Sequence, residues 1–147
     1  IKILGKDKDL KKLRKHAKYA IVSVGQVGIS SVRKQIYLRL NKLGFIIPTI
    51  ISPHSYVSKT SKIGAGSIVH HGVIINALAK IGKNCIINSK SLIEHGVKVG
   101  DHTHISTSCV INGDTKIESE CFLGSNSVIR NNIQIKKGTF IKMGKNV

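Results

Sequence analysis

An aliphatic residue recurs at every sixth position from Val57 to Val147, and the register never slips. A period of six fits neither an amphipathic helix nor a simple alternating strand. It is the period of a hexapeptide β-helix, in which three hexapeptides make one triangular coil. The sequence therefore predicts about five parallel coils, each of which buries its aliphatic residues only against its neighbours.

A second phase of the repeat carries small or apolar residues four positions after each aliphatic one, and all three cysteines fall in it. These are Cys85, Cys109 and Cys121. An odd number of cysteines without a CxxC motif argues against a disulfide framework. We expect all three to be packing residues inside the coils.

Glycine recurs directly after the periodic aliphatic residue in several coils. We expect these glycines to form tight corners that require the conformational freedom of glycine. They are Gly64, Gly82, Gly100 and Gly124.

Residues 1–50 lack the six-residue period and predict a partial small α/β domain of Rossmann-like type, ahead of a β-helix domain over 51–147. Asp7 or Asp9 is suited to cap a basic helix that runs to about Lys18. Short strands are expected over 20–25 and 45–47. A second helix is expected to end at Gly44, with one apolar face formed by Ile29, Val32, Ile36, Leu40 and Leu43.

The segment Gly25-Gln26-Val27-Gly28 follows the first predicted strand. A loop at the carboxyl end of such a strand is a common ligand position, so Gly25 and Gly28 are candidate substrate-binding residues. A plain strand–helix turn is the alternative, because the chain has no G-x-G-x-x-G fingerprint.

The net charge of +17 raises the question of a nucleic-acid partner. The basic residues are dispersed, only four are Arg, and aromatic residues for base stacking are few. We therefore expect no nucleic acid, and we expect the positive field to attract an anionic cofactor such as a coenzyme A. No apolar run is long enough to span a membrane and no signal peptide is evident, so a cytoplasmic location is expected.

Nearly the whole chain resembles the bacterial sialic acid O-acetyltransferase and UDP-amino-sugar N-acetyltransferase family of hexapeptide-repeat acyltransferases. The most specific match runs from Ile86 through Asn88 and Glu94-His95, and continues over 100–106. Further matching stretches are 4–10, 22–25, 33–37 and 44–53.

The resemblance implies a left-handed β-helix, a homotrimer, acetyl-CoA as co-substrate and a sugar or nucleotide-sugar acceptor. The implied reaction is O-acetylation of sialic acid or N-acetylation of a nucleotide amino sugar in surface-glycan synthesis. The family's first strand with its Gly-rich loop, and its last coil, are expected to be absent here. A non-catalytic remnant or a trimeric assembly module of the same family is therefore the alternative.

The resemblance also implies roles for three residues. His95 matches the family's catalytic histidine, and a histidine suits a general base near neutral pH. His104 and Asn88 match positions that contact the thioester region of acetyl-CoA, and His104 is expected to donate a hydrogen bond to the thioester carbonyl. His95 and His104 lie half a coil apart in sequence, so we expect them to meet across a subunit boundary.

One position departs from the family pattern. The family has an acid directly after the catalytic histidine, and this chain has Gly96. Glu94 precedes His95, but adjacent residues on a strand point to opposite faces. Asp114 is expected near the place one coil above His95, where it is a weaker substitute.

A zinc enzyme on the same prism is a further alternative, because His95, His102 and His104 are clustered in sequence. His102 and His104 are only two residues apart and no matching acid and amide pattern stands out. We therefore expect no metal site.

Overall fold

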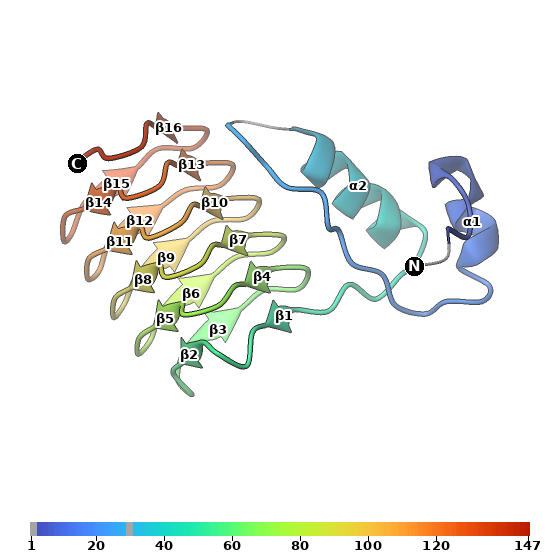
Figure 1. Ribbon diagram of the computed structural model, residues 1–147, viewed down its shortest axis with the longest axis horizontal. Coiled ribbons are helices and arrows are strands. Elements are labelled where there is room, and N and C mark those ends of the chain that lie inside the picture. The colour runs from blue at the N-terminus through green and yellow to red at the C-terminus, as the bar shows by residue number, and fades with distance from the viewer. Residues whose placement is uncertain (1–2, 29–30) are drawn as a thin grey trace.

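The computed structural model describes residues 3–28 and 31–147, which form a parallel β-solenoid with a helical N-terminal part beside it (Figure 1). The N-terminal elements are η1 (Asp7–Asp9), α1 (Leu10–Leu13) and α2 (Ser31–Lys42). The solenoid strands are β1 (Ile50–Ile51), β2 (Tyr56–Val57), β3 (Lys62–Ile63), β4 (Ile68–Val69), β5 (Ile74–Ile75), β6 (Lys80–Ile81), β7 (Ile86–Ile87), β8 (Leu92–Ile93), β9 (Lys98–Val99), β10 (His104–Ile105), β11 (Val110–Ile111), β12 (Lys116–Ile117), β13 (Phe122–Leu123), β14 (Val128–Ile129), β15 (Gln134–Ile135) and β16 (Phe140–Ile141).

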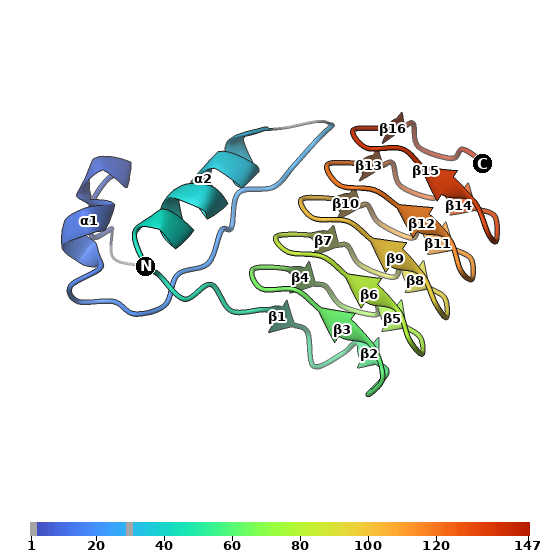
Figure 2. The ribbon, with the colours of Figure 1, turned by 180° about the vertical axis from the view of Figure 1, so that it is seen from behind.

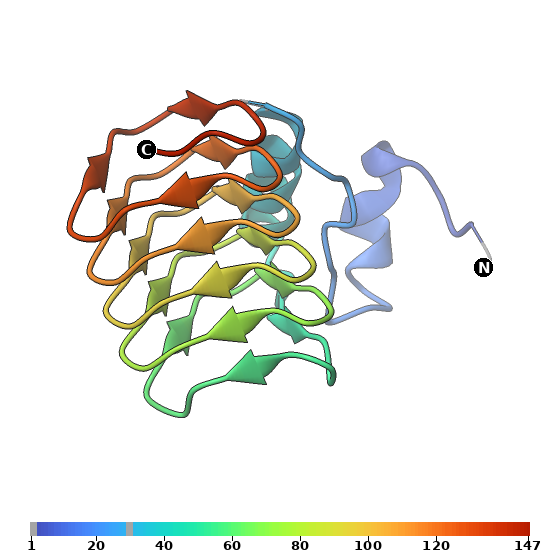
Figure 3. The same ribbon diagram turned by 60° about the vertical axis from the view of Figure 1, so that its left-hand side comes forward.

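The strands form three parallel sheets, one along each side of the prism, as the triangular coils in Figure 3 show. Sheet B has the order β1-β4-β7-β10-β13-β16, sheet C the order β14-β11-β8-β5-β2, and sheet D the order β15-β12-β9-β6-β3. Each strand pairs with the one eighteen residues later; Ile86, for example, pairs with His104. The parallel β-helix predicted from the period of six is confirmed.

The interior of the prism is filled by the periodic aliphatic residues. From Val69 to Ile141 every one of them is buried, whereas Val57, Ile63 and Val147 at the ends are partly buried. The three cysteines are fully buried in the same core, which confirms their prediction as packing residues. Burial raises the pKa of the Cys85 thiol to about 12, so this thiol stays protonated.

The glycines that follow the aliphatic residues are needed for a different reason from the one predicted. None of Gly64, Gly82, Gly100 and Gly124 has a positive φ. A Cβ at Gly100 would clash with the backbone nitrogen of Ser119 on the next coil, and a Cβ at any of the other three would lie within 2.6 Å of the next coil. These positions therefore require glycine because adjacent coils approach closely there.

The predicted N-terminal helix is shorter than expected. A 3-10 turn over Asp7–Asp9 leads into α1, which ends at Leu13 rather than near Lys18. No residue of η1 or α1 is buried. A single turn of helix with little packing gains too little to be extended through a lysine-rich segment.

The strands predicted over 20–25 and 45–47 are reduced to one isolated parallel bridge between Tyr19 and Ile46. Arg33 explains this difference. Its buried guanidinium donates hydrogen bonds to the carbonyls of Val22 (2.6 Å) and Val24 (2.9 Å), the acceptors that a neighbouring strand would otherwise use. It also donates to the carbonyl of Gly66, and so ties the N-terminal part to the prism.

Helix α2 runs alongside the prism, as Figure 2 shows from behind, and ends as predicted before Gly44 at φ +79°. Its predicted apolar face is only partly correct. Leu40 is buried, whereas Val32 is 52% exposed. Tyr37, rather than Val32, is buried against the prism. Ile29 lies outside the described residues.

The N-terminal part has its own small core, separate from that of the prism. It comprises Val22, Tyr37, Leu40, Phe45 and Ile47. A Cβ at Gly66 would lie 2.6 Å from the Tyr37 ring, so the prism corner must be glycine for α2 to approach. Among the described residues no helix has both the length and the apolar character needed to cross a membrane.

We predict that Ile105→Asp unfolds the prism, because Ile105 is completely buried and an unpaired charge cannot be accommodated in this apolar interior. Lys98→Asp is the control, since Lys98 is exposed on the outside of the same stack. Urea unfolding followed by circular dichroism measures both variants. Equal stability of the two would contradict the inward and outward assignment.

Candidate active site

The outward residues of the three sheets form three columns of different chemistry, because paired strands place like positions above one another. Sheet C carries an apolar column of Tyr56, Ile74, Leu92, Val110 and Val128. Sheet D carries Lys62, Lys80, Lys98, Lys116 and Gln134. Sheet B carries Ile50, Ile68, Ile86, His104, Phe122 and Phe140.

His95 lies at the corner that follows β8, between sheets C and D. Its side chain is 61% exposed, and its Nδ1 lies 3.8 Å from a carboxylate oxygen of Asp114 on the next coil. The neighbouring Glu94 is directed elsewhere, because its Oε2 accepts a hydrogen bond from Asn76 Nδ2 (2.9 Å). The imidazole is therefore accessible from solvent.

His104 lies on β10 in the outward column of sheet B and is buried beneath the N-terminal part. Its Nδ1–H donates a 2.5 Å hydrogen bond to the backbone carbonyl of Gln26, and its ring packs edge-on against Phe122. Nε2 is buried and makes no hydrogen bond to the described residues. Burial lowers the pKa of His104, so the neutral ring is favoured, with Nε2 as a free acceptor.

The loop that contains Gly25 and Gly28 lies over the same column. Gln26, which the sequence did not single out, is buried between these glycines and binds His104 through its carbonyl. Gly28 has φ +71°, and a Cβ there would lie 3.7 Å from the Phe140 ring. The structure thus brings together a predicted substrate loop and a predicted cofactor residue that are far apart in sequence.

Asn88 lies at the corner after β7, and its backbone N–H donates a 2.9 Å hydrogen bond to the carbonyl of Ile105, the residue that follows His104. Its Oδ1 accepts a hydrogen bond from the backbone N–H of Ser89 (2.8 Å), which stabilises the turn. The Nδ2 group of Asn88 makes no hydrogen bond within the described part of the chain, and it remains available to a ligand.

One chain does not bring His95 and His104 together. His95 follows a strand of sheet C, whereas His104 is on sheet B. The alternative zinc site is not assembled either, because His102 hydrogen-bonds to Asn84 and packs against Tyr37. Over residues 3–28 and 31–147 no group of three or more His, Cys, Asp or Glu side chains is placed to hold a metal ion.

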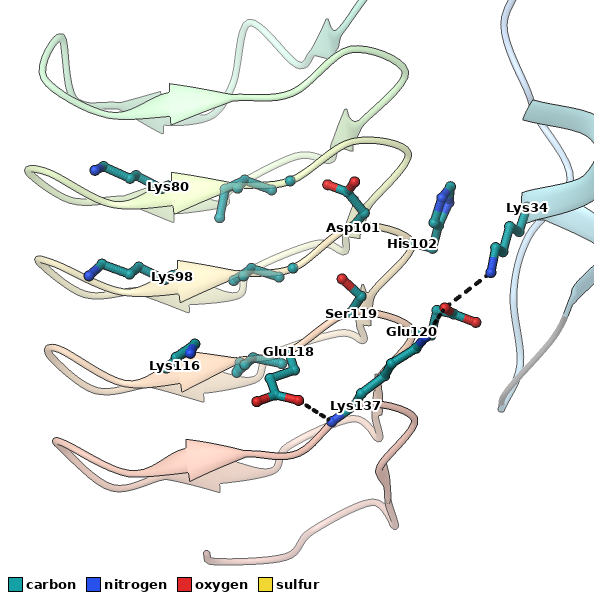
Figure 4. Close-up of a pocket in the computed structure, with 15 residues that line it drawn as sticks. Lys34, Lys80, Lys98, Asp101, His102, Lys116, Glu118, Ser119, Glu120 and Lys137 are labelled. Carbon is teal, nitrogen blue, oxygen red and sulfur yellow. Dashed lines mark hydrogen bonds and ion pairs between the residues drawn. The ribbon is translucent and has the colours of Figure 1, made fainter. Parts of the chain in front are cut away.

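A cavity of about 680 Å³ lies between sheet D and α2, and none of the predicted site residues lines it (Figure 4). Glu120 bridges Lys34 of α2 (3.0 Å) and Lys137 of the prism (3.1 Å) across its rim. Glu118 accepts a hydrogen bond from the Lys137 backbone N–H. The carboxylates here therefore hold the N-terminal part and the turns in place.

Residues 45–143 match the family model of the GMPPB C-terminal domain. No curated protein matches the chain in sequence. Solved structures with a similar fold include the acetyltransferase domain of PglB from Neisseria gonorrhoeae, with a TM-score of 0.85 and 24% identity over 99% of this chain and 70% of that one. A mutant perosamine N-acetyltransferase from Caulobacter crescentus, in complex with CoA and GDP-perosamine, gives a TM-score of 0.75 and 21% identity over 95% of this chain and 73% of that one.

These likenesses extend over the N-terminal part as well as the prism. A second structure of the PglB domain, in complex with acetyl coenzyme A, gives a TM-score of 0.59 and 24% identity over 82% of this chain and 64% of that one. The resemblance to acetyltransferases that was inferred from the sequence is confirmed at the level of the fold.

We predict that the free energy of unfolding falls as the pH drops below about 6.5. Burial lowers the pKa of His70, His102 and His104 from the ordinary value of 6.5, so the unfolded chain binds protons that the folded chain excludes. His104→Gln should reduce this pH dependence, and His16→Gln at an exposed position should not. Urea unfolding between pH 5 and 7.5 measures the slopes; the prediction is wrong if His104→Gln leaves the slope unchanged.

Proposed function

We propose that this chain, which belongs to the GMPPB C-terminal domain family, is an acetyl-CoA-dependent acetyltransferase for a bacterial surface-glycan sugar. This function fits the prism together with its N-terminal part. The observation that carries the proposal is the fold likeness over 99% of the chain to an acetyltransferase domain. A prism alone is compatible with many functions, but the likeness includes the N-terminal part as well. The acceptor class is a nucleotide amino sugar, acetylated on nitrogen, or a sialic acid, acetylated on oxygen.

His95 is the proposed general base. Its exposed imidazole has the reach to take a proton from an amine or hydroxyl acceptor, and histidine is the side chain most often used as a general base. The N-terminal part, as a partial nucleotide-sugar-binding domain over 1–50, would present the acceptor through the loop of Gly25 and Gly28. The prism over 51–147 would be the acyltransferase domain, with the left-handed coil that the family resemblance implies.

His104 and Asn88 are the proposed contacts to acetyl-CoA. The free, buried Nε2 of His104 supports a ligand contact, because a buried polar atom without a partner is costly. The donor role expected for His104 toward the thioester carbonyl does not fit this ring, since its one N–H already binds the Gln26 carbonyl. We therefore assign Nε2 as an acceptor for an N–H donor such as an amide group of the coenzyme.

A homotrimer is part of the proposal, and the apolar column of sheet C supports it. Sheet B is covered by the N-terminal part and sheet D presents lysines, whereas Tyr56 is 60% and Ile74 43% exposed on sheet C. A further copy of the chain that packs on sheet C would lie beside the His95 corner. This arrangement would bring His95 of one copy toward His104 of another.

We expect His95→Ala to lower acetyl transfer by roughly a hundredfold or more, the range for a positioned general base. Binding of CoA should persist, because the base acts on the acceptor. Thiol release from acetyl-CoA with a panel of nucleotide amino sugars and sialic acids measures the rate, and calorimetric titration with CoA measures binding. His16→Ala is the control at an exposed histidine far from the site.

The same CoA titration distinguishes the proposed enzyme from the main alternative. Gly96 in place of the family's acid favours a non-catalytic assembly module as the second candidate. A chain that binds no CoA and acetylates no member of the panel would be assigned to that class instead.

We expect light scattering to give about three times the 16.0 kDa mass of one chain. Ile74→Lys should dissociate the assembly, because it places a charge in the exposed apolar column. Lys80→Ala, in the lysine column at the same level of the prism, is the matched control. A wild-type monomer would contradict the trimer.

A further inference from the structure

We infer that Asp114 is the positioning carboxylate of His95 and replaces, from the next coil, the acid that would directly follow the histidine. The inference deepens the proposed function and rests on it. Its starting point is the 3.8 Å separation between His95 Nδ1 and Asp114 Oδ2.

The backbone holds these two residues at a fixed separation. The N–H of Asp114 donates a 3.0 Å hydrogen bond to the carbonyl of His95. Both residues lie at the same corner of successive coils, so their side chains leave the prism in the same direction. A movement of about 1 Å by either side chain closes the gap to a hydrogen bond.

Two glycines make room for the pair, one on each coil. A Cβ at Gly96 would lie 2.0 Å from Asp114 Oδ1, which fills the space beside the histidine. A Cβ at Gly113 would lie 2.7 Å from Cε1 and Nε2 of His95. The imidazole therefore lies over Gly113 and the carboxylate over Gly96, so each glycine accommodates the functional side chain of the other coil.

No other acid among the described residues is placed to serve this histidine. Glu94 is bound to Asn76 and to the backbone N–H of His95. The groove that contains Gly96 and Asp114 is otherwise lined by Leu78 and by the lysine column. None of those lysines forms an ion pair with Asp114 in the described part of the chain, so its carboxylate is available to His95.

The chemistry follows from this orientation. With Nδ1–H directed at Asp114, Nε2 of His95 carries the lone pair and takes the proton of the acceptor's amine or hydroxyl. The acceptor nitrogen or oxygen bonds to the acetyl carbon, the carbon–sulfur bond breaks, and the leaving thiolate receives the proton from the imidazolium. The Asp114 carboxylate favours that imidazolium by its opposite charge.

The test begins with Asp114→Asn, which removes the charge and keeps the shape. Asparagine tolerates the φ of +59° at this corner, so the variant should fold. We expect the midpoint of the His95 ring NMR titration to move to lower pH in this variant, because the opposite charge that favours the imidazolium is removed. The acidic limb of the kcat/KM profile should move in the same direction, and CoA affinity should not change. Asp101→Asn, at a different corner, should leave the His95 pKa unchanged.

Rescue distinguishes positioning from a general structural effect. Gly96→Asp in an Asp114→Gly background should restore both the His95 pKa and the rate, because the acid then directly follows the histidine. Gly96→Asp alone should add nothing, since the new side chain must displace the Asp114 carboxylate. This non-additivity is the signature of one shared position.

A His95 pKa that does not respond to Asp114→Asn would overturn the inference, as would an additive gain from Gly96→Asp alone. The NMR titration requires no turnover. A pKa that responds in a chain without acetyl transfer therefore supports the pairing and rejects the proposed function alone.

Discussion

The stacking of one coil on the next is the constraint on which the rest of this structure depends. Each strand is only two residues long and no coil has a core of its own, so stability comes from the interior that successive coils share. Because the stacking is in register, residue i always lies beside residue i + 18. The same rule that places Ile87 above Val69 in the core also places Phe122 above His104 on the outside. Core and surface columns therefore arise from one spacing.

Because of this register, the three faces of the prism differ in their surface chemistry. The outward column of sheet B, which is isoleucine in its first half and aromatic from His104 on, receives the N-terminal part. Arg33 and the Gln26 carbonyl fix the loop over His104. The lysines of sheet D repel one another and do not favour close packing of another basic chain. The apolar column of sheet C is the surface on which the proposed trimer would form. The corners between faces, where neither packing nor pairing fixes the side chain, are where His95 and Asp114 lie.

The prism was predictable from sequence because its period is independent of tertiary detail; Ile105 and Cys109 are buried as their phase requires. The N-terminal part was less predictable, since its expected strand 20–25 gives its carbonyls to Arg33, a long-range contact that no local pattern encodes. The contact between Gln26 and His104 spans 78 positions and had no sequence signal at all. For Gly100 the residue type was recognised but its reason was not, because close coil approach is visible only in three dimensions.

In the proposed site, the His95 corner illustrates how a β-solenoid can supply the partner of a side chain from the next coil without a change in its core. In most folds the partner of a catalytic side chain must be supplied by a particular loop, but here residues 18 and 19 positions later are also direct neighbours. An acid at position 114 reaches the imidazole from the coil above, provided that neither coil has a side chain in the intervening space. In its observed orientation the Asp114 carboxylate occupies the space that a side chain at 96 would enter. Two segments therefore form one arrangement: His95-Gly96 on one coil and Gly113-Asp114 on the next. A motif read along the chain alone finds Gly96 where the family has an acid and does not include Asp114.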